Sequence, residues 1–260
     1  MMWDPVKYVQ FGDARDRPFF DLTGRVQADG PLNVVDLGCG PGNLTATLAG
    51  RWPEARVTGI DSSAAMLAKA GVHAEANRGL SFQLADIADW MPAADTDVVV
   101  TNAALQWLPG HQEMMARWLK ALKPGAWFAM QVPGNFNAPS HLLMRDLAGS
   151  AAWAAKLDGV LRGGESVGEP ADYLRIMLDA GCTADAWETT YLQLLPGADP
   201  VLEWVRGTAL RPVLAALSTD DGRAFEAEYA VRLRAAYPAT GHGTVFPFRR
   251  IFAVARKGRQ

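Results

Sequence analysis

Residues 34–42 read Val34-Val35-Asp36-Leu37-Gly38-Cys39-Gly40-Pro41-Gly42, an apolar run that ends in a loop with three glycines. The apolar, β-branched residues of 32–37 predict a buried strand, and the apolar spacing over 43–51 predicts a helix after the loop. A strand, a glycine turn and a helix place free backbone N–H groups at the carboxyl end of the strand, and glycine lets a ligand approach the backbone closely. This stretch therefore predicts the ligand site of an α/β protein.

Acidic residues at the ends of three successive predicted strands indicate which ligand the loop binds. Asp36 precedes the glycines, where its charge repels a pyrophosphate and attracts a cation. Asp61 ends a strand over 56–61 and suits a ribose diol, while Asp86 and Ile87 follow the next strand and suit an adenine amine and its ring. A single acid at a strand end is often a helix cap or a solvated turn. Three acids beside one glycine turn favour a cationic nucleoside.

The loop also departs from the dinucleotide-binding pattern G-x-G-x-x-G. The third glycine of that pattern would fall at position 43, which is Asn43. This asparagine and the charge of Asp36 argue against a nicotinamide dinucleotide. An NAD-dependent oxidoreductase is the alternative from another enzyme class.

Strands and helices alternate along most of the chain, which predicts an α/β fold with a doubly wound, mostly parallel, seven-stranded sheet. The predicted strands cover residues 32–37, 56–61, 80–85, 97–102, 126–132, 187–194 and 249–255. Helices between them are predicted over 43–51, from the serines Ser62-Ser63 as N-cap, over 113–122 and over 170–180.

Three segments interrupt this alternation, and we expect them to form a helical cap on a single domain of residues 1–260. The cap segments are residues 1–30, 133–168 and 196–245. Within them the sequence predicts a helix from residue 6, a charged turn over 13–17, a second helix that begins at Pro18, and helices over 141–153, 200–217 and 221–237.

Composition limits the partners of this chain. Of its 260 residues 49% are hydrophobic and 20% are charged, the net charge is −3, and no dense Lys/Arg cluster occurs. These values are typical of a globular protein that binds a small molecule rather than nucleic acid. No apolar run approaches the roughly 20 residues of a membrane span, and we see no signal peptide. With Cys39 in the glycine loop and Cys182 as the other cysteine, reduced thiols and a cytoplasmic location are expected.

Several motifs resemble those of the class I S-adenosylmethionine-dependent methyltransferases. They are residues 36–42, Gly59-Ile60-Asp61, Asp86-Ile87 and Leu122-Lys123-Pro124-Gly125. Longer runs are similar to the trans-aconitate 2-methyltransferase family: Trp3-Asp4-Pro5 with Tyr8, Phe11 and 15–18, then 102–109, 139–145, Trp204-Val205 with 210–212, and 246–252. The resemblance spans nearly the whole chain, including the interrupting segments.

This resemblance implies methyl transfer from S-adenosylmethionine to a carboxylate of trans-aconitate, which gives a monomethyl ester and S-adenosylhomocysteine. The run Phe246-Pro247-Phe248-Arg249-Arg250 departs from the family's usual form because it is one residue longer and one arginine richer. It stays open whether Arg249 or Arg250 faces the cleft. A methyltransferase that acts on another small acid, such as an isopropylmalate-like acid, and a non-catalytic donor-binding protein are further alternatives.

Carboxylate methylation makes few demands on catalytic side chains. A carboxylate with a pKa of about 4 is already ionised at neutral pH, so no general base and no catalytic residue in that sense are expected. The step destroys charge, which favours a dry site, and alignment of the reactants can supply on the order of 7–11 kcal/mol of the barrier. Besides His141, the chain contains His73, His111 and His242. These three have no spacing typical of a metal site, so no metal is expected.

Two sets of candidate site residues follow. The predicted donor-binding residues are Asp36, Gly38, Gly40, Asp61, Ser62, Met66, Asp86, Ile87, Asn102 and Gln106. The predicted substrate-binding residues are Tyr8, Arg17, Trp107, His141, Arg145, Arg211 and Arg250. Arginine forks hold carboxylates well, and we expect them on the two carboxylates that do not react, because tight pairing blunts a nucleophile.

Each substrate-site candidate also has a purely structural interpretation. An arginine on a helix is usually a solvated surface charge. Arg211, before Pro212, fits the end of a helix, Trp107 fits a core aromatic, and His141 fits a helix cap. The sequence does not indicate an oligomeric state.

Overall fold

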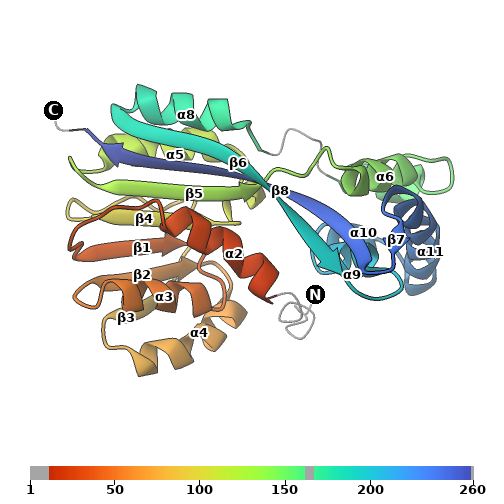
Figure 1. The fold of residues 1–260 in the computed structure, drawn as a ribbon, viewed down its shortest axis with the longest axis horizontal. Helices are drawn as coiled ribbons and strands as arrows, with labels where there is room; N and C mark the ends of the chain where they lie inside the picture. Colours follow the sequence, from red (N-terminus) through yellow and green to blue (C-terminus); the bar gives the residue numbers. More distant parts are fainter. Residues whose placement is uncertain (1–11, 162–166, 259–260) are drawn as a thin grey trace. The chain divides into compact units, whose positions relative to one another are not determined.

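The computed structural model describes residues 12–161 and 167–258, which divide into two compact units (Figure 1). The sheet unit contains Asp16–Pro133, Val167–Thr189 and Arg250–Gln260. The helical unit contains Met1–Arg15, Gly134–Ser166 and Thr190–Arg249. The helical unit is thus assembled from three stretches of sequence, close to the three interruptions that the sequence analysis identified. Residues 16–30 fall within the sheet unit, where Phe19, Leu22 and Val26 are buried.

The sheet unit is built on parallel strands, as predicted. They are β1 (Asn33–Leu37), β2 (Arg56–Asp61), β3 (Leu80–Leu84), β4 (Val98–Asn102) and β5 (Trp127–Pro133). The sheet order is β3-β2-β1-β4-β5-β8-β6, with β8 (Gly243–Lys257) antiparallel to β5 and β6 (Cys182–Leu195) after it. Seven strands lie on this path, and the two-residue β7 (Ala239–Thr240) adds an eighth beside β8.

Strand register divides the side chains of the sheet between two faces. Asp36, Val100 and Ala129 are register partners and share one face, called here the Asp36 face. It is covered by α3 (Asn43–Arg51), whose Thr45 contacts Asp36. The residues that alternate with these along each strand lie on the opposite face, called here the Leu37 face. This face packs against α5 (His111–Ala121) and α8 (Pro170–Asp179) in one hydrophobic core.

The helical unit has a hydrophobic core of its own. Its helices are α6 (Pro139–Ala148), α7 (Ala154–Leu157), α9 (Pro200–Arg206), α10 (Arg211–Ala216) and α11 (Thr219–Ala236). Trp204, Phe225 and Tyr229 are almost fully buried in this core. Phe246 joins them and contacts Trp204 edge-on, with ring centroids 5.8 Å apart. Aromatic packing of this kind holds short helices that would be marginal alone.

The N-terminal helix differs from its prediction. No helix begins at Pro18; instead α2 (Gly12–Thr23) includes Pro18 and the residues predicted as a charged turn. Proline removes one backbone hydrogen bond inside a helix, but burial of Phe19 and Leu22 stabilises the helix on both sides of that gap. The helix predicted from residue 6 lies outside the described residues, as does Tyr8.

The prediction of one helix over 200–217 is also wrong, because this segment contains two helices, α9 and α10. Gly207 caps α9, and Pro212 stands at the start of α10, where it cannot donate a hydrogen bond to the preceding turn. In the same way the helix predicted over 141–153 ends at Ala148. β6 and β8 extend beyond their predicted bounds. In these extensions one side of each strand is largely exposed, so the sequence there has no continuous apolar run that would predict a strand.

No helix within residues 12–161 and 167–258 is long and apolar enough to cross a membrane.

Candidate active site

The three glycines of the loop after β1 have different physical roles. A Cβ on Gly38, whose φ is +77°, would lie 2.3 Å from Ala104 Cβ, and one on Gly42 would lie 2.6 Å from Phe82 Cζ. Both distances are far below van der Waals contact, so packing within the protein requires these two glycines. Gly40 has φ +55° and no atom within 4 Å of its Cβ position. Gly40 therefore leaves open space at the carboxyl end of β1.

Asp36 is a buried acid beside this loop. Its side chain is 3% exposed and Thr45 Oγ1 donates a 2.6 Å hydrogen bond to Asp36 Oδ2. Burial raises the pKa of Asp36 to about 6, although the hydrogen bond from Thr45 opposes this rise and the charge of Asp61 adds to it. The carboxylate is still mostly ionised at neutral pH, in surroundings that would be stabilised by a cation.

Asp61 is oriented by two backbone groups at the carboxyl end of β2. Gly40 N donates to Asp61 Oδ2 at 2.9 Å, and Ser63 N donates to Asp61 Oδ1 at 2.8 Å. Each carboxylate oxygen keeps a free lone pair, so the group can also accept hydrogen bonds from a diol. These bonds link Asp61 to the glycine loop and hold it rigidly beside the open space at Gly40.

The helix after β2 begins with a serine cap, as predicted. Ser63 Oγ accepts a 3.4 Å hydrogen bond from Met66 N at the start of α4 (Ala64–Ala76). Ser62 is exposed and Met66 is half-buried. Their roles in donor binding stay predictions.

The third acid, Asp86, forms a turn. Asp86 Oδ1 accepts a hydrogen bond from Ala88 N at 2.8 Å, and the side chain is exposed. Ile87 is 8% exposed and belongs to the core on the Leu37 face. The contact of these two residues with an adenine stays a prediction.

The loop after β4 is strained. Ala103 has φ +54° and is the one non-glycine residue with positive φ in the part of the chain that the structure describes. Ala103 N donates to Gln131 O at 2.9 Å, and Gln106 Nε2 donates to Ala103 O at 2.6 Å. Such a conformation costs on the order of 1–3 kcal/mol and is typical of functional sites. It places Asn102 and Gln106, two predicted donor contacts, around one fixed turn.

Register separates the two arginines that the sequence left undecided. Arg250 is 7% exposed and is the partner of Pro133, so it lies on the Asp36 face. Arg249 points from the opposite side of the strand, and its Nη1 donates to Gly134 O at 3.3 Å. The structure thus favours Arg250 as the arginine that accompanies the carboxyl ends of the strands.

The other predicted substrate residues of the sheet unit are on the surface. Arg17 is exposed on α2 and its Nε lies 3.7 Å from Asp21 Oδ2, while Trp107 is 54% exposed. The exposure of Arg17 fits its interpretation as a solvated surface charge. A substrate contact by Arg17 or Trp107 stays a prediction.

Three predicted substrate residues lie in the described part of the helical unit. His141 is buried, and burial, with the nearby charge of Arg145, lowers its pKa to about 4, so the ring is neutral. Arg145 Nη1 donates to Phe136 O at 2.8 Å. Arg211 does not end a helix; it begins α10 and is half-buried. Their roles toward a substrate stay predictions.

Sequence reasoning missed Thr45 and Gln131. Nothing in the helix sequence marks Thr45 as the partner of Asp36. Gln131 did have a signal, since it is a carboxamide inside the apolar strand Trp127-Phe128-Ala129-Met130-Gln131-Val132. It is fully buried, and neither its Nε2 nor its Oε1 has a hydrogen-bond partner among the described residues.

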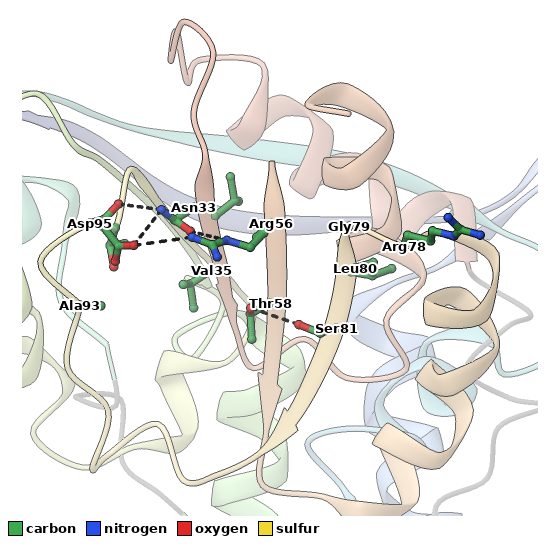
Figure 2. Close-up of a pocket in the computed structure, with 12 residues that line it drawn as sticks. Asn33, Val35, Arg56, Thr58, Arg78, Gly79, Leu80, Ser81, Ala93 and Asp95 are labelled. Carbon is green, nitrogen blue, oxygen red and sulfur yellow. Dashed lines mark hydrogen bonds and ion pairs between the residues drawn. The ribbon is translucent and has the colours of Figure 1, made fainter. Parts of the chain in front are cut away.

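A pocket of about 320 Å³ lies at the opposite, amino end of the strands (Figure 2). Several of its polar residues bind one another: Asn33 Nδ2 donates to Asp95 Oδ2 at 3.1 Å, and Arg56 lies 3.9 Å from the same carboxylate. Ligands of open parallel sheets bind at the carboxyl ends of the strands. This pocket is therefore separate from the candidate active site.

Comparisons with known proteins identify the family of this chain. A family profile described as a methyltransferase domain matches residues 34–125. A trans-aconitate 2-methyltransferase from Streptomyces avermitilis is 54% identical over 98% of this chain and 97% of its own length. One from Rhodococcus jostii is 54% identical over 98% of this chain and 99% of its own. The chain belongs to the trans-aconitate 2-methyltransferase family.

Solved structures confirm the predicted fold of this family member. A Haemonchus contortus phosphoethanolamine N-methyltransferase 2, in complex with phosphomonomethylethanolamine and S-adenosylhomocysteine, superposes with a TM-score of 0.53 at 16% identity. The match covers 94% of this chain and 53% of that chain, so this family member spans about half the length of that protein. At this identity the likeness concerns the fold alone.

Proposed function

We propose that this protein transfers the methyl group of S-adenosylmethionine to a carboxylate of trans-aconitate, which gives the monomethyl ester and S-adenosylhomocysteine. The observation that carries the proposal is the 54% identity to trans-aconitate 2-methyltransferases over nearly the full length of both chains. The geometry at the carboxyl ends of β1 and β2 supports the donor, because buried Asp36 favours a cation and the oriented Asp61 suits a diol.

The residues of the chain would hold the donor from three sides. Asp36 supplies a negative charge for the ammonium and sulfonium groups, Asp61 accepts the ribose hydroxyls, and Asp86 with Ile87 contacts the adenine. Gly38, Gly40, Ser62, Met66, Asn102 and Gln106 complete the proposed donor site. S-adenosylmethionine supplies an activated methyl group bonded to a positively charged sulfur. No metal ion enters the proposed reaction.

The acceptor needs orientation rather than deprotonation. Its carboxylates are ionised at neutral pH, so the protein has no proton to remove before the transfer. Arg250 is the proposed partner of a carboxylate that does not react, since it is buried on the Asp36 face. The remaining proposed acceptor contacts are Tyr8, Arg17, Trp107, His141, Arg145 and Arg211.

A transfer assay tests the reaction. The purified protein is mixed with S-adenosylmethionine labelled in its methyl group and with trans-aconitate, and labelled monomethyl ester is the expected product. Labelling of an isopropylmalate-like acid in preference to trans-aconitate would replace the substrate but keep the reaction type. No labelled ester from any small di- or tricarboxylate would overturn the proposed function.

A second measurement separates the proposal from an oxidoreductase. S-adenosylmethionine or S-adenosylhomocysteine should raise the melting temperature, by an amount that grows with the logarithm of its concentration above Kd, and NAD should not. Stabilisation by NAD alone would overturn the assignment of the donor. We also propose a cytoplasmic location, which the absence of a disulfide at Cys39 and Cys182 supports.

A further inference from the structure

Gln131 is a carboxamide in the middle of the sheet whose hydrogen-bonding capacity is unused. The residue is 0% exposed, and its Nε2 and Oε1 both lack a hydrogen-bond partner in residues 12–161 and 167–258. Its strand neighbours Met130 and Val132 are equally buried. Unpaired buried polar atoms destabilise a folded protein, and apolar residues of similar size would not. On the face of the sheet that carries Asp36, the carboxamide is best explained by a ligand that pairs with it.

Strand register gives the surroundings of this side chain. Gln131 is the partner of Asn102 on β4 and of Phe252 on β8, and all three share the Asp36 face. Asn102 Oδ1 is also buried and has no partner among the described residues. Arg250 stands two residues before Phe252 and thus on the same face. Gln131 lies between the proposed donor contact Asn102 and the proposed acceptor contact Arg250.

Chemistry indicates what a neutral amide contributes at this place. The carboxylate that reacts must be held in line with the methyl group, but a full positive charge on it would reduce its nucleophilicity. An amide N–H donates a hydrogen bond to a carboxylate oxygen without neutralising it. Arginine suits the other carboxylates because their charge is not used in the reaction.

We propose that Gln131 Nε2 donates a hydrogen bond to the acceptor carboxylate that receives the methyl group and thereby selects which carboxylate is esterified. This inference rests on the proposed function. A lone pair of the carboxylate oxygen forms the new C–O bond, the C–S bond breaks, and the sulfur keeps the electron pair of that bond. No proton moves, and the positive and negative charges cancel. Because Gln131 is fully buried, neighbouring side chains move when the acceptor binds, and the transfer takes place away from water.

The variant Gln131→Met keeps the size of the side chain and removes the amide. We expect kcat with trans-aconitate to fall about 10- to 100-fold, since a hydrogen bond to a charged group is lost at the reacting atom. The KM of the acceptor should change less than about threefold, because the arginines still hold the other carboxylates. Arg250→Ala should show the reverse pattern, with a raised acceptor KM.

Product analysis gives a readout that a structural role would not change. Trans-aconitate has three different carboxylates, so nuclear magnetic resonance of the products shows which one carries the methyl group. The wild type should form one monomethyl ester, and Gln131→Met should form a mixture. Donor affinity, measured by calorimetry with S-adenosylhomocysteine, should be the same in both proteins.

A matched control is available on the opposite face of the sheet. Thr101 is also fully buried, and its Oγ1 has no partner in the described part of the chain, but it lies on the Leu37 face. Thr101→Val should leave kcat, KM and the ester pattern unchanged. Equal losses in Thr101→Val and Gln131→Met would overturn the proposal, because both would then report general damage to β4 and β5.

A charged variant provides a second route if Gln131→Met fails to fold. Gln131→Glu places a negative charge beside the reacting carboxylate, so kcat/KM should fall more than about 100-fold at pH 8 and partly recover toward pH 6, where a buried glutamate is protonated and donates again. An unchanged pH profile would overturn the proposal.

The experiment also separates this inference from the proposed function. Methylation of trans-aconitate by the wild type tests the function alone. The ratio of variant to wild type, measured on whichever acid the wild type methylates, tests Gln131. An unchanged ratio and ester pattern would overturn the role of Gln131 and leave the function intact, whereas a wild type that methylates no acid would overturn both.

Discussion

The two ends of the parallel strands contain aspartates whose pKa values are shifted in opposite directions. At the amino end, Asp97 Oδ2 accepts hydrogen bonds from Leu32 N and Asn33 N, and Asp97 Oδ1 lies 2.6 Å from Lys123 Nζ. Partial burial alone would raise the pKa of Asp97, but Lys123 and the two N–H groups hold it below its usual value. At the carboxyl end, burial raises the pKa of Asp36 to about 6.

The direction of the pKa shift distinguishes polar residues that stabilise the fold from polar residues that we propose bind a ligand. At the amino end, Asp97 is paired with Lys123 and two backbone N–H groups, and Asn33 and Arg56 of the pocket in Figure 2 are paired with Asp95. The carboxyl end holds a buried acid, the strained Ala103 and the unpaired Gln131. Each of these features destabilises the protein, and together they support the proposed binding site at this end of the sheet.

The largest expected effect is a loss of donor affinity that occurs at the carboxyl end of the strands and not at the amino end. Asp61→Ala removes the acceptor of the ribose hydroxyls and of Gly40 N and Ser63 N. We expect the Kd of S-adenosylhomocysteine to rise about 100-fold or more, which corresponds to ~3 kcal/mol. Calorimetry measures this value.

Asp95→Ala is the control at the amino end, where the carboxylate is largely exposed. Its donor affinity should stay within about twofold of the wild type. Equal losses in the two variants would contradict the placement of the ribose at Asp61.

The second effect concerns stability at the carboxyl end. A rise of the pKa of Asp36 from 3.8 to about 6 means that the ionised group destabilises the folded state by roughly 3 kcal/mol at pH 7. Because a raised acid pKa favours the folded state only at low pH, this penalty is absent below about pH 4 and complete above pH 6. Asp36→Asn should therefore raise the free energy of unfolding by roughly 2–3 kcal/mol at pH 7 without donor, measured in urea. Donor affinity should fall in the same variant, and a variant that is less stable would contradict the assignment of strain to Asp36.

The third effect is the opposite change at the amino end. Asp97→Ala removes the acceptor of two backbone N–H groups and the partner of Lys123, so the free energy of unfolding should fall by about 2 kcal/mol at pH 7. Since the pKa of Asp97 is lowered in the folded state, the stability that it contributes is present above its unfolded pKa and is lost as the pH falls through its lowered, folded pKa. Donor affinity should not change, and a loss of affinity would mean that the two ends are coupled.

The smallest effect is the pH dependence of donor binding. Only ionised Asp36 attracts a cation, so donor affinity should weaken about tenfold from pH 7 to pH 5 and be nearly constant above pH 7. Titration calorimetry in two buffers of different ionisation enthalpy should detect proton release on binding near pH 6. Asp36→Asn should abolish both effects; if it keeps them, another group titrates.

The sequence predicted the sheet well because buried parallel strands are continuous apolar runs between turns. The runs around Leu37, Ile60 and Val100 gave bounds within one or two residues of the observed strands. It predicted the helices of the interrupting segments less well. α2 and the pair α9 and α10 depend on tertiary burial and on single prolines, which outweigh the local pattern.

The candidate site was predictable where a residue's position in the chain determines its role. Asp36 and Asp61 follow from the motif, since the ends of adjacent parallel strands meet. The choice between Arg249 and Arg250 required the register of β8 against β5. The state of Gln131 required the full set of hydrogen bonds, because sequence does not show whether a buried amide has a partner.

The pairing of β5 with β8 also has a consequence for synthesis on the ribosome. β5 ends at Pro133, and the residues that pair with it begin only at Arg250. At roughly 5–20 residues per second, translation of the chain between them takes on the order of ten seconds. During that time the apolar β5 is an open sheet edge, which is a template for aggregation. Slower translation between these two strands would lengthen the time for which this edge is open.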